Sequence, residues 1–64
     1  MPTIRVEMFP GRTPEQKEKL AQRFTQAFVE EAGAKAESVH VVFYDVSPGD
    51  WAVGGRLCAP RQST

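Results

Sequence analysis

The sequence predicts an α/β fold that consists of a single βαβ unit with parallel strands and a short C-terminal hairpin. Alternating apolar and polar residues from Thr3 to Phe9 indicate one strand, and the β-branched and aromatic residues from Ser38 to Asp45 indicate another. The segment between them has the caps and apolar spacing of one long helix, and strands joined in this way run parallel. After a turn over Ser47 to Asp50, Trp51 to Gly55 fits a small hairpin or a segment that pairs with a neighbouring chain.

The first strand has one apolar face. Ile4, Val6 and Met8 alternate with polar residues, so their side chains point to the same side of the strand. Pro10 followed by Gly11 then favours a turn and ends the strand. This strand can therefore pack one side against a helix.

The helix is predicted over Pro14 to Ala32. Thr13 suits the N-cap, Pro14 suits the first helical position, and Gln16 completes a capping box. Apolar residues then recur with helical spacing and form a stripe: Leu20, Phe24 and Phe28, widened by Ala21, Ala27 and Ala32. Gly33 is suited to the left-handed conformation that ends many helices.

The second strand has apolar residues on both faces. These are Val42 and Tyr44 on one face, and Val39, Val41 and Phe43 on the other. One helix covers a single face of a two-stranded sheet, so the other face needs a second subunit. A chain of 64 residues also rarely builds a sufficient core without a disulfide, a metal or oligomerisation. Because Cys58 is the single cysteine, we expect a homo-oligomer.

The composition excludes several classes of partner. Eight basic residues balance eight acidic ones, which argues against binding to nucleic acid. The apolar runs are far shorter than the roughly 18 residues of a membrane-spanning helix, so we expect no membrane partner. One histidine and one cysteine cannot build a Cys/His zinc site, and the lone thiol of Cys58, expected to be inert, fits a reducing cytoplasm. We expect one cytoplasmic domain over residues 1–64 that uses no metal.

Pro2 is the first candidate for chemistry. A small residue after Met1 normally permits removal of the methionine, and Pro2 would then begin the mature protein with a secondary amine. A free α-amino group titrates near pH ~7.7–8.0, and apolar burial or nearby cations lower that value. A base near the working pH suits general base catalysis. Met-Pro starts are common, however, so Pro2 indicates a base only in combination with other residues.

Five segments together give the chain its resemblance to a known family. They are Met1-Pro2, Gly11-Arg12, Thr13 to Lys17 (TPEQK), Ser38 to Val42 (SVHVV) and Trp51 to Gly55 (WAVGG). In this order and spacing, the chain resembles the short-chain 4-oxalocrotonate tautomerase family over nearly its whole length. The resemblance implies βαβ subunits that pair into a four-stranded sheet, three such dimers in a homohexamer, and active sites where subunits meet. It also implies an isomerase that needs no cofactor and acts on a small unsaturated 2-hydroxy/2-oxo acid.

The same resemblance assigns the site residues. Pro2 matches the general base, and Arg12 matches the arginine that binds the distal carboxylate of a diacid. Trp51 stands where the family has an aromatic wall that keeps water from the proline amine. Phe9 and Val53 are apolar neighbours that would line the same pocket.

His40 departs from the family pattern. The family has an arginine at this place, which holds the 1-carboxylate and the 2-oxo group of the substrate. Arginine offers a permanently charged, bidentate fork to a carboxylate, whereas a histidine offers fewer donors and carries charge only in acid. We therefore expect His40 to contact the substrate and to bind its carboxylate more weakly than an arginine would. The specificity of the enzyme for dicarboxylates should then be reduced or altered.

Two other functions fit the same residues. A lyase or dehalogenase of the same superfamily would use a protonated Pro2 as an acid and a carboxylate to activate water, for which Asp50 is the nearby acid. A non-catalytic subunit, or one half of a hetero-oligomer whose partner supplies the missing arginine, would explain His40.

Overall fold

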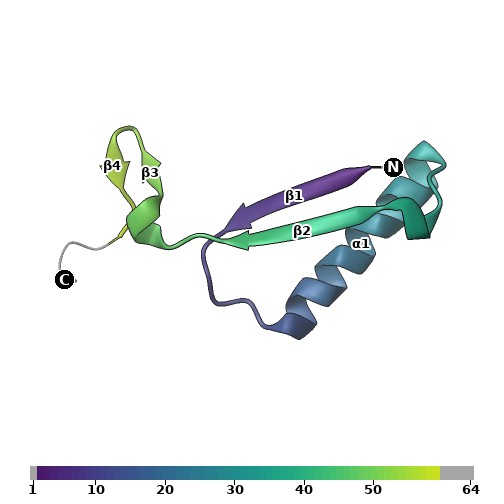
Figure 1. Ribbon diagram of the computed structural model, residues 1–64, viewed down its shortest axis with the longest axis horizontal. Helices are drawn as coiled ribbons and strands as arrows, with labels where there is room; N and C mark the ends of the chain where they lie inside the picture. The colour runs from purple at the N-terminus through teal and green to yellow at the C-terminus, as the bar shows by residue number, and fades with distance from the viewer. Residues whose placement is uncertain (1, 60–64) are drawn as a thin grey trace.

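The computed structural model describes residues 2–59 and has the predicted α/β architecture (Figure 1). A parallel pair of strands is joined by one helix and followed by a small antiparallel hairpin. In chain order the elements are β1 (Thr3–Met8), α1 (Pro14–Ala32), the 3-10 helix η1 (Ala36–Ser38), β2 (His40–Asp45), the 3-10 helix η2 (Pro48–Asp50), β3 (Ala52–Val53) and β4 (Arg56–Leu57). In the parallel pair, Thr3 lies opposite His40 and Met8 lies opposite Asp45.

α1 begins and ends at the residues predicted from the sequence, because both of its ends are capped as expected. The Thr13 hydroxyl accepts a hydrogen bond from the Gln16 amide at 3.1 Å, and Gln16 Oε1 accepts one from the Thr13 amide at 2.9 Å. This reciprocal capping box satisfies amides that the helix itself leaves unpaired. Gly33 closes the other end with a φ of 71°, a conformation that costs glycine little.

β1 is one residue shorter than predicted and stops at Met8 rather than Phe9. The Met8 carbonyl accepts a hydrogen bond of 2.7 Å from the Val46 amide, just past the end of β2. Pro10 has no amide with which to continue the ladder. The chain therefore leaves the sheet at Phe9, whose ring is free to contact a segment outside it.

β2 starts at His40 rather than at Ser38. The Ser38 hydroxyl and the Ser38 amide both donate to the Lys35 carbonyl, at 2.8 and 2.9 Å. Serine side chains can satisfy nearby backbone groups in this way and so compete with sheet formation. Ser38 is therefore the last residue of the short helix η1 rather than the first residue of the strand.

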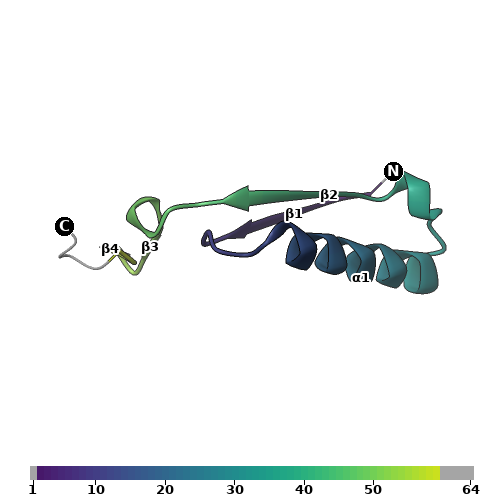
Figure 2. The same ribbon diagram turned by 90° about the horizontal axis from the view of Figure 1, so that it is seen from below.

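α1 covers one face of the β1–β2 pair and leaves the other face open (Figure 2). The strand side chains on the helix side are partly buried, and they are Ile4, Val6, Met8, Val41 and Phe43. On the opposite face, Val42 and Tyr44 expose 37% and 42% of their surface. Arg5 lies over the Tyr44 ring, 5.1 Å from its centroid. The open face is thus partly apolar and has no cover within the subunit.

The stripe of α1 that packs against the sheet is narrower than predicted. Leu20, Phe24 and Phe28 are partly buried, whereas Ala27 and Ala32 are exposed. Within residues 2–59 no side chain is fully buried, so one subunit has no closed core. A chain this small gains little stability from such partial burial. We therefore expect further subunits to complete the core.

β3 and β4 form a hairpin that projects beyond the end of the βαβ unit (Figure 1). Gly54 and Gly55 make its two-residue turn with φ values of 61° and 83°. Residues other than glycine rarely adopt such positive φ values. The projection makes the molecule long and flat, with extents of 47 × 25 × 14 Å. Its radius of gyration is 15.3 Å, against about 11 Å for a compact domain of this length. Most of the hairpin surface is therefore left uncovered by its own chain.

We expect Val42→Glu to disrupt assembly, because it places a charge on the open sheet face where a partner subunit would bury it. Light scattering should show the native mass falling from that of an oligomer toward that of the single chain. Gln22→Glu adds the same charge to the exposed surface of α1 and should leave the native mass unchanged. An oligomer that survives Val42→Glu intact would show that the open face is not a subunit contact.

Candidate active site

Two of the predicted site residues, Pro2 and His40, lie at the N-terminal end of the parallel strand pair. The His40 amide donates a hydrogen bond of 2.9 Å to the Pro2 carbonyl, one position before β1 begins. Pro2 is partly buried and His40 is exposed. This bond ties the backbone of Pro2 to β2 through its carbonyl, and the proline nitrogen, which carries no hydrogen within the chain, donates no bond to the sheet.

The other four predicted residues lie at the opposite end of the strand pair. Phe9 directly follows β1, and Arg12 is exposed in the loop that leads to α1. Trp51 follows η2 and meets Phe9 edge to face, with ring centroids 5.1 Å apart and planes at 72°. Val53 lies on the hairpin and exposes 67% of its surface. Aromatic contacts of this geometry add to the stability gained by burial alone, so this one anchors the hairpin to the body.

One subunit therefore does not bring the predicted site together. A strand of six residues spans about 20 Å, and the length of β1 separates Pro2 from Phe9, Arg12 and Trp51. His40 and Pro2 also lie on opposite faces of the sheet. Side chains two residues apart on a strand point to the same face, so His40 points with Val42 to the open face of the sheet. Pro2 precedes Ile4 by two residues and is therefore on the side that faces the helix. Any pocket that contains all the predicted residues has to be completed by another subunit.

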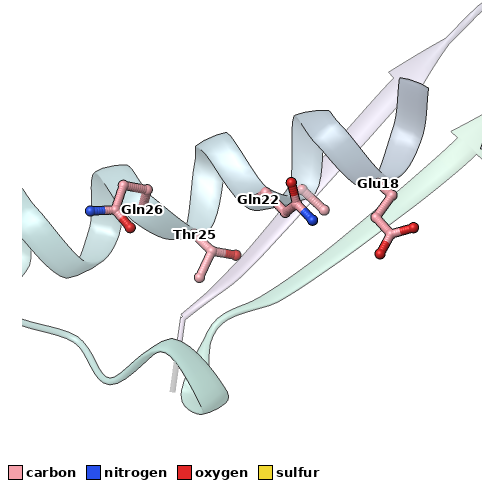
Figure 3. A pocket seen from close by; sticks show the side chains of 5 residues that line it. Glu18, Gln22, Thr25 and Gln26 are labelled. Carbon is pink, nitrogen blue, oxygen red and sulfur yellow. The ribbon is translucent and has the colours of Figure 1, made fainter. Parts of the chain in front are cut away.

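Hollows along α1 are separate from these residues. One of about 440 Å³ is lined by side chains of the helix alone: Glu18, Ala21, Gln22, Thr25 and Gln26 (Figure 3). Another of about 490 Å³ shares part of that lining and is formed by Lys19, Gln22, Arg23 and Gln26. Both are grooves between polar side chains of one helix, and neither contains a predicted site residue. The helix surface is thus not the predicted active site.

Two arginines at the hairpin end of the molecule have no carboxylate partner in the part of the chain that the structure describes. The ion pair found there joins Lys17 Nζ to Asp45 Oδ2 at 2.9 Å and links the start of α1 to the end of β2. Arg12 and Arg56 are exposed and take no part in it. A guanidinium without a protein partner can form charge-assisted, bidentate hydrogen bonds with a carboxylate ligand.

Arg56 was not among the residues singled out from the sequence. It lies on β4 directly opposite Val53 of β3, one of the predicted pocket residues. The signal that could have found it is the pair Gly54-Gly55, since a two-residue turn makes the flanking residues cross-strand partners. The segment predicted as a small hairpin or a pairing segment ended at Gly55, so it did not include β4.

Two further features bear on the kinds of ligand. Within residues 2–59, no helix is both long enough and apolar enough to cross a membrane. Over the same residues, histidine, cysteine and acidic side chains do not gather in groups of three or more that could hold a metal ion.

Comparisons with known proteins identify the class. A family model described as tautomerase enzyme matches residues 2–61. A probable tautomerase of Ralstonia nicotianae is 36% identical over 64 residues, which are 100% of this chain and 98% of the relative. The 2-hydroxymuconate tautomerase of Comamonas testosteroni is 36% identical over 55 residues, which are 86% of this chain and 87% of the relative. The chain belongs to the tautomerase family.

The fold agrees with this membership. The crystal structure of TomN, a 4-oxalocrotonate tautomerase homologue in the tomaymycin biosynthetic pathway, matches with a TM-score of 0.86 and 36% identity. The match covers 98% of this chain and 97% of that one. The family and fold that the sequence motifs indicated are therefore confirmed.

Phe9→Leu should loosen the hairpin, because it keeps an apolar side chain but removes the ring that meets Trp51. Trp51 is the only tryptophan of the chain, so its fluorescence reports on this contact directly. We expect its emission to shift to longer wavelength and its quenching by acrylamide to rise. Phe28→Leu removes a ring from α1 and should leave both quantities unchanged. If Phe9→Leu also leaves them unchanged, the aromatic contact does not hold the hairpin.

Proposed function

We propose that the chain is a cofactor-independent tautomerase that uses Pro2, exposed as the amino-terminal residue by removal of Met1, as its general base. The substrate is an unsaturated 2-hydroxy/2-oxo acid. Membership of the tautomerase family supports the class of reaction. The observation that supports the assignment of Pro2 is its hydrogen bond to His40, which fixes the residue by its carbonyl at the end of the strand pair.

The proton transfer needs no outside reactant. The unprotonated Pro2 nitrogen takes the proton from the 2-hydroxy group of the enol acid, and the electron pair of the O–H bond forms the C=O bond. The π electrons move along the conjugated chain to a carbon atom, which takes the proton back from the Pro2 ammonium. The product is an isomer of the substrate, and the amine returns to its starting state. Positioning of a base in this way contributes about 10²- to 10⁴-fold to a rate.

The pocket in this proposal is shared between subunits. Pro2 lies about 20 Å from the hairpin end of its own chain, so the residues that meet its amine come from a neighbour. Arg12 of that neighbour binds the distal carboxylate, and its charge draws electrons along the conjugated chain. The Phe9–Trp51 pair and Val53 exclude water from the amine and so favour its neutral, basic form. A homohexamer built from dimers supplies such contacts to every subunit.

A second function is favoured by His40 in particular. A subunit that lacks the family arginine could be one half of a hetero-oligomer, with an active site completed by a partner chain of the same fold. The open sheet face and the exposed hairpin offer surfaces for either kind of assembly. Purification of the chain on its own as an active enzyme would exclude this function, whereas co-purification of a similar short chain would support it.

Blocking the Pro2 nitrogen should abolish the activity, because an amide nitrogen has no basic lone pair. A form with an uncleaved tag before Pro2 should ketonise a 2-hydroxydienoate about 10²- to 10⁴-fold more slowly than a form with the same tag at the C-terminus. Intact mass should show that the active form lacks Met1. Activity that is equal in the two forms would rule out the amine as the base.

The activity of the unblocked enzyme should rise with pH. Only the unprotonated amine accepts a proton, so kcat/KM increases through the pKa of the amine and is constant above it. The midpoint should lie at or below the value of a free α-amino group, about pH 8. The residual rate of the amino-terminally tagged form should not show this increase of kcat/KM with pH.

His40→Arg should raise kcat/KM for a dicarboxylate enol by about 10-fold, since a permanently charged fork replaces a side chain with fewer donors. His40→Gln, which also lacks the fork, should not produce this gain. A loss of activity in His40→Arg would indicate that the histidine has a structural role or that the native substrate has no carboxylate at this place.

A further inference from the structure

We propose that Ser38 is a positioning residue for the Pro2 amine, which its hydroxyl holds in place through the short helix η1 and the start of β2. This inference rests on the proposed function and deepens it, because Ser38 acts on the base through the backbone and not on the substrate. A run of hydrogen bonds that joins Lys35, Ser38, His40 and Pro2 carries it.

Pro2 is held by β2 at its carbonyl. It lies one position before β1, and its carbonyl accepts a hydrogen bond of 2.9 Å from the His40 amide. The pyrrolidine ring fixes the N–Cα bond, so a single rotatable bond, Cα–C, separates the nitrogen from this carbonyl. A shift of the His40 amide would therefore move the amine with it.

η1 sets the direction in which the His40 amide points. The Ser38 amide donates to the Lys35 carbonyl at 2.9 Å, and the Val39 amide donates to the Ala36 carbonyl at 3.1 Å. Val39 is then extended, with φ −91° and ψ 123°, and His40 begins β2. Only Val39 separates the end of η1 from the amide that holds Pro2. The backbone direction at the end of η1 is thus passed directly to that amide.

The Ser38 hydroxyl stabilises this turn. It donates to the Lys35 carbonyl at 2.8 Å, the same oxygen that accepts from the Ser38 amide. A single 3-10 turn has poor hydrogen-bond geometry and is weak by itself. In the part of the chain that the structure describes, Lys35 at the N-cap of η1 makes no capping bond with its side chain. The partly buried Ser38 supplies the side-chain support that the N-cap does not.

The expected effect of Ser38 is on the chemical step. A general base has to lie within hydrogen-bond reach of the proton that it takes, and a displacement of about 1 Å can cost about 10²-fold in rate. Removal of the hydroxyl leaves the backbone bonds of η1 in place, so a smaller displacement and a loss of about 10-fold in kcat are expected. In the proposed pocket the distal carboxylate is bound by Arg12 of a neighbour, so KM should change little.

The first measurement is amide hydrogen exchange on the intact, Met1-processed protein, which does not depend on turnover. Ser38→Ala should speed the exchange of the His40 amide about 10-fold, as expected for the loss of one hydrogen bond that supports it. The Val46 amide is the internal control, because it donates to the Met8 carbonyl at the other end of the strand pair. Its exchange should not change. Ser38→Thr keeps a hydroxyl and should keep slow exchange at His40.

The second measurement is turnover of a 2-hydroxydienoate by the same proteins. Ser38→Ala should lower kcat about 10-fold and leave KM and the midpoint of the pH profile nearly unchanged, because the base is displaced rather than altered. Ser38→Thr should restore most of the rate. Thr25→Val, which removes a hydroxyl from a partly buried position of α1, is the matched control and should change neither exchange nor kcat.

Each outcome decides the inference. Unchanged exchange of the His40 amide in Ser38→Ala overturns it, as does equal acceleration at His40 and Val46, which would indicate a general loosening of the fold. Faster exchange at His40 with intact kcat retains the proposed function and overturns the positioning role. A wild type with a free Pro2 amine and no turnover of enol acids overturns the proposed function, and the exchange data then assign Ser38 a role in the fold alone.

Discussion

A two-stranded parallel sheet has two faces, and in this subunit α1 covers only one of them. Ile4, Val6 and Phe43 pack toward the helix, while Val42 and Tyr44 remain on the open face. The helix cannot close the core by itself, and no side chain within residues 2–59 is fully buried. Burial of apolar surface is the main source of stability in folded proteins, so a single chain with this partial burial gains little of it.

The proposed active site follows from the same constraint. β1 is long enough to hold Pro2 far from the hairpin end of its own chain, so the amine and the arginines can meet only across a subunit contact. The projecting hairpin suits this arrangement, because Phe9 and Trp51 anchor its base while its two-residue turn fixes the direction of the side chains beyond. In the proposed assembly, a neighbouring subunit would cover the open sheet face and would also complete the pocket.

Much of the fold could be predicted from the sequence because its signals are local. Thr13, Gln16 and Gly33 define the ends of α1 through contacts within a few residues. The strand ends were less predictable, since a serine hydrogen bond to Lys35 competes with the start of β2 and no pattern of apolar residues reports it. The family motifs indicated the candidate site residues, but the separation of these residues along β1 is a property of the three-dimensional arrangement. The pairing of Arg56 with Val53 was not predicted, because it follows from the hairpin register and no motif reports it.

The placement of Pro2 and Arg12 at opposite ends of one strand has a genetic consequence. If each pocket takes its amine from one chain and its guanidinium from another, two alleles that are each inactive need not be inactive together. A chain that has lost the amine still offers an intact Arg12, and a chain that has lost Arg12 still offers an intact amine. Mixed assemblies of the two would contain some complete pockets, so the alleles would complement each other. Mutations at two residues only ten positions apart in the sequence would then complement each other in a genetic cross, as mutations in two different genes do.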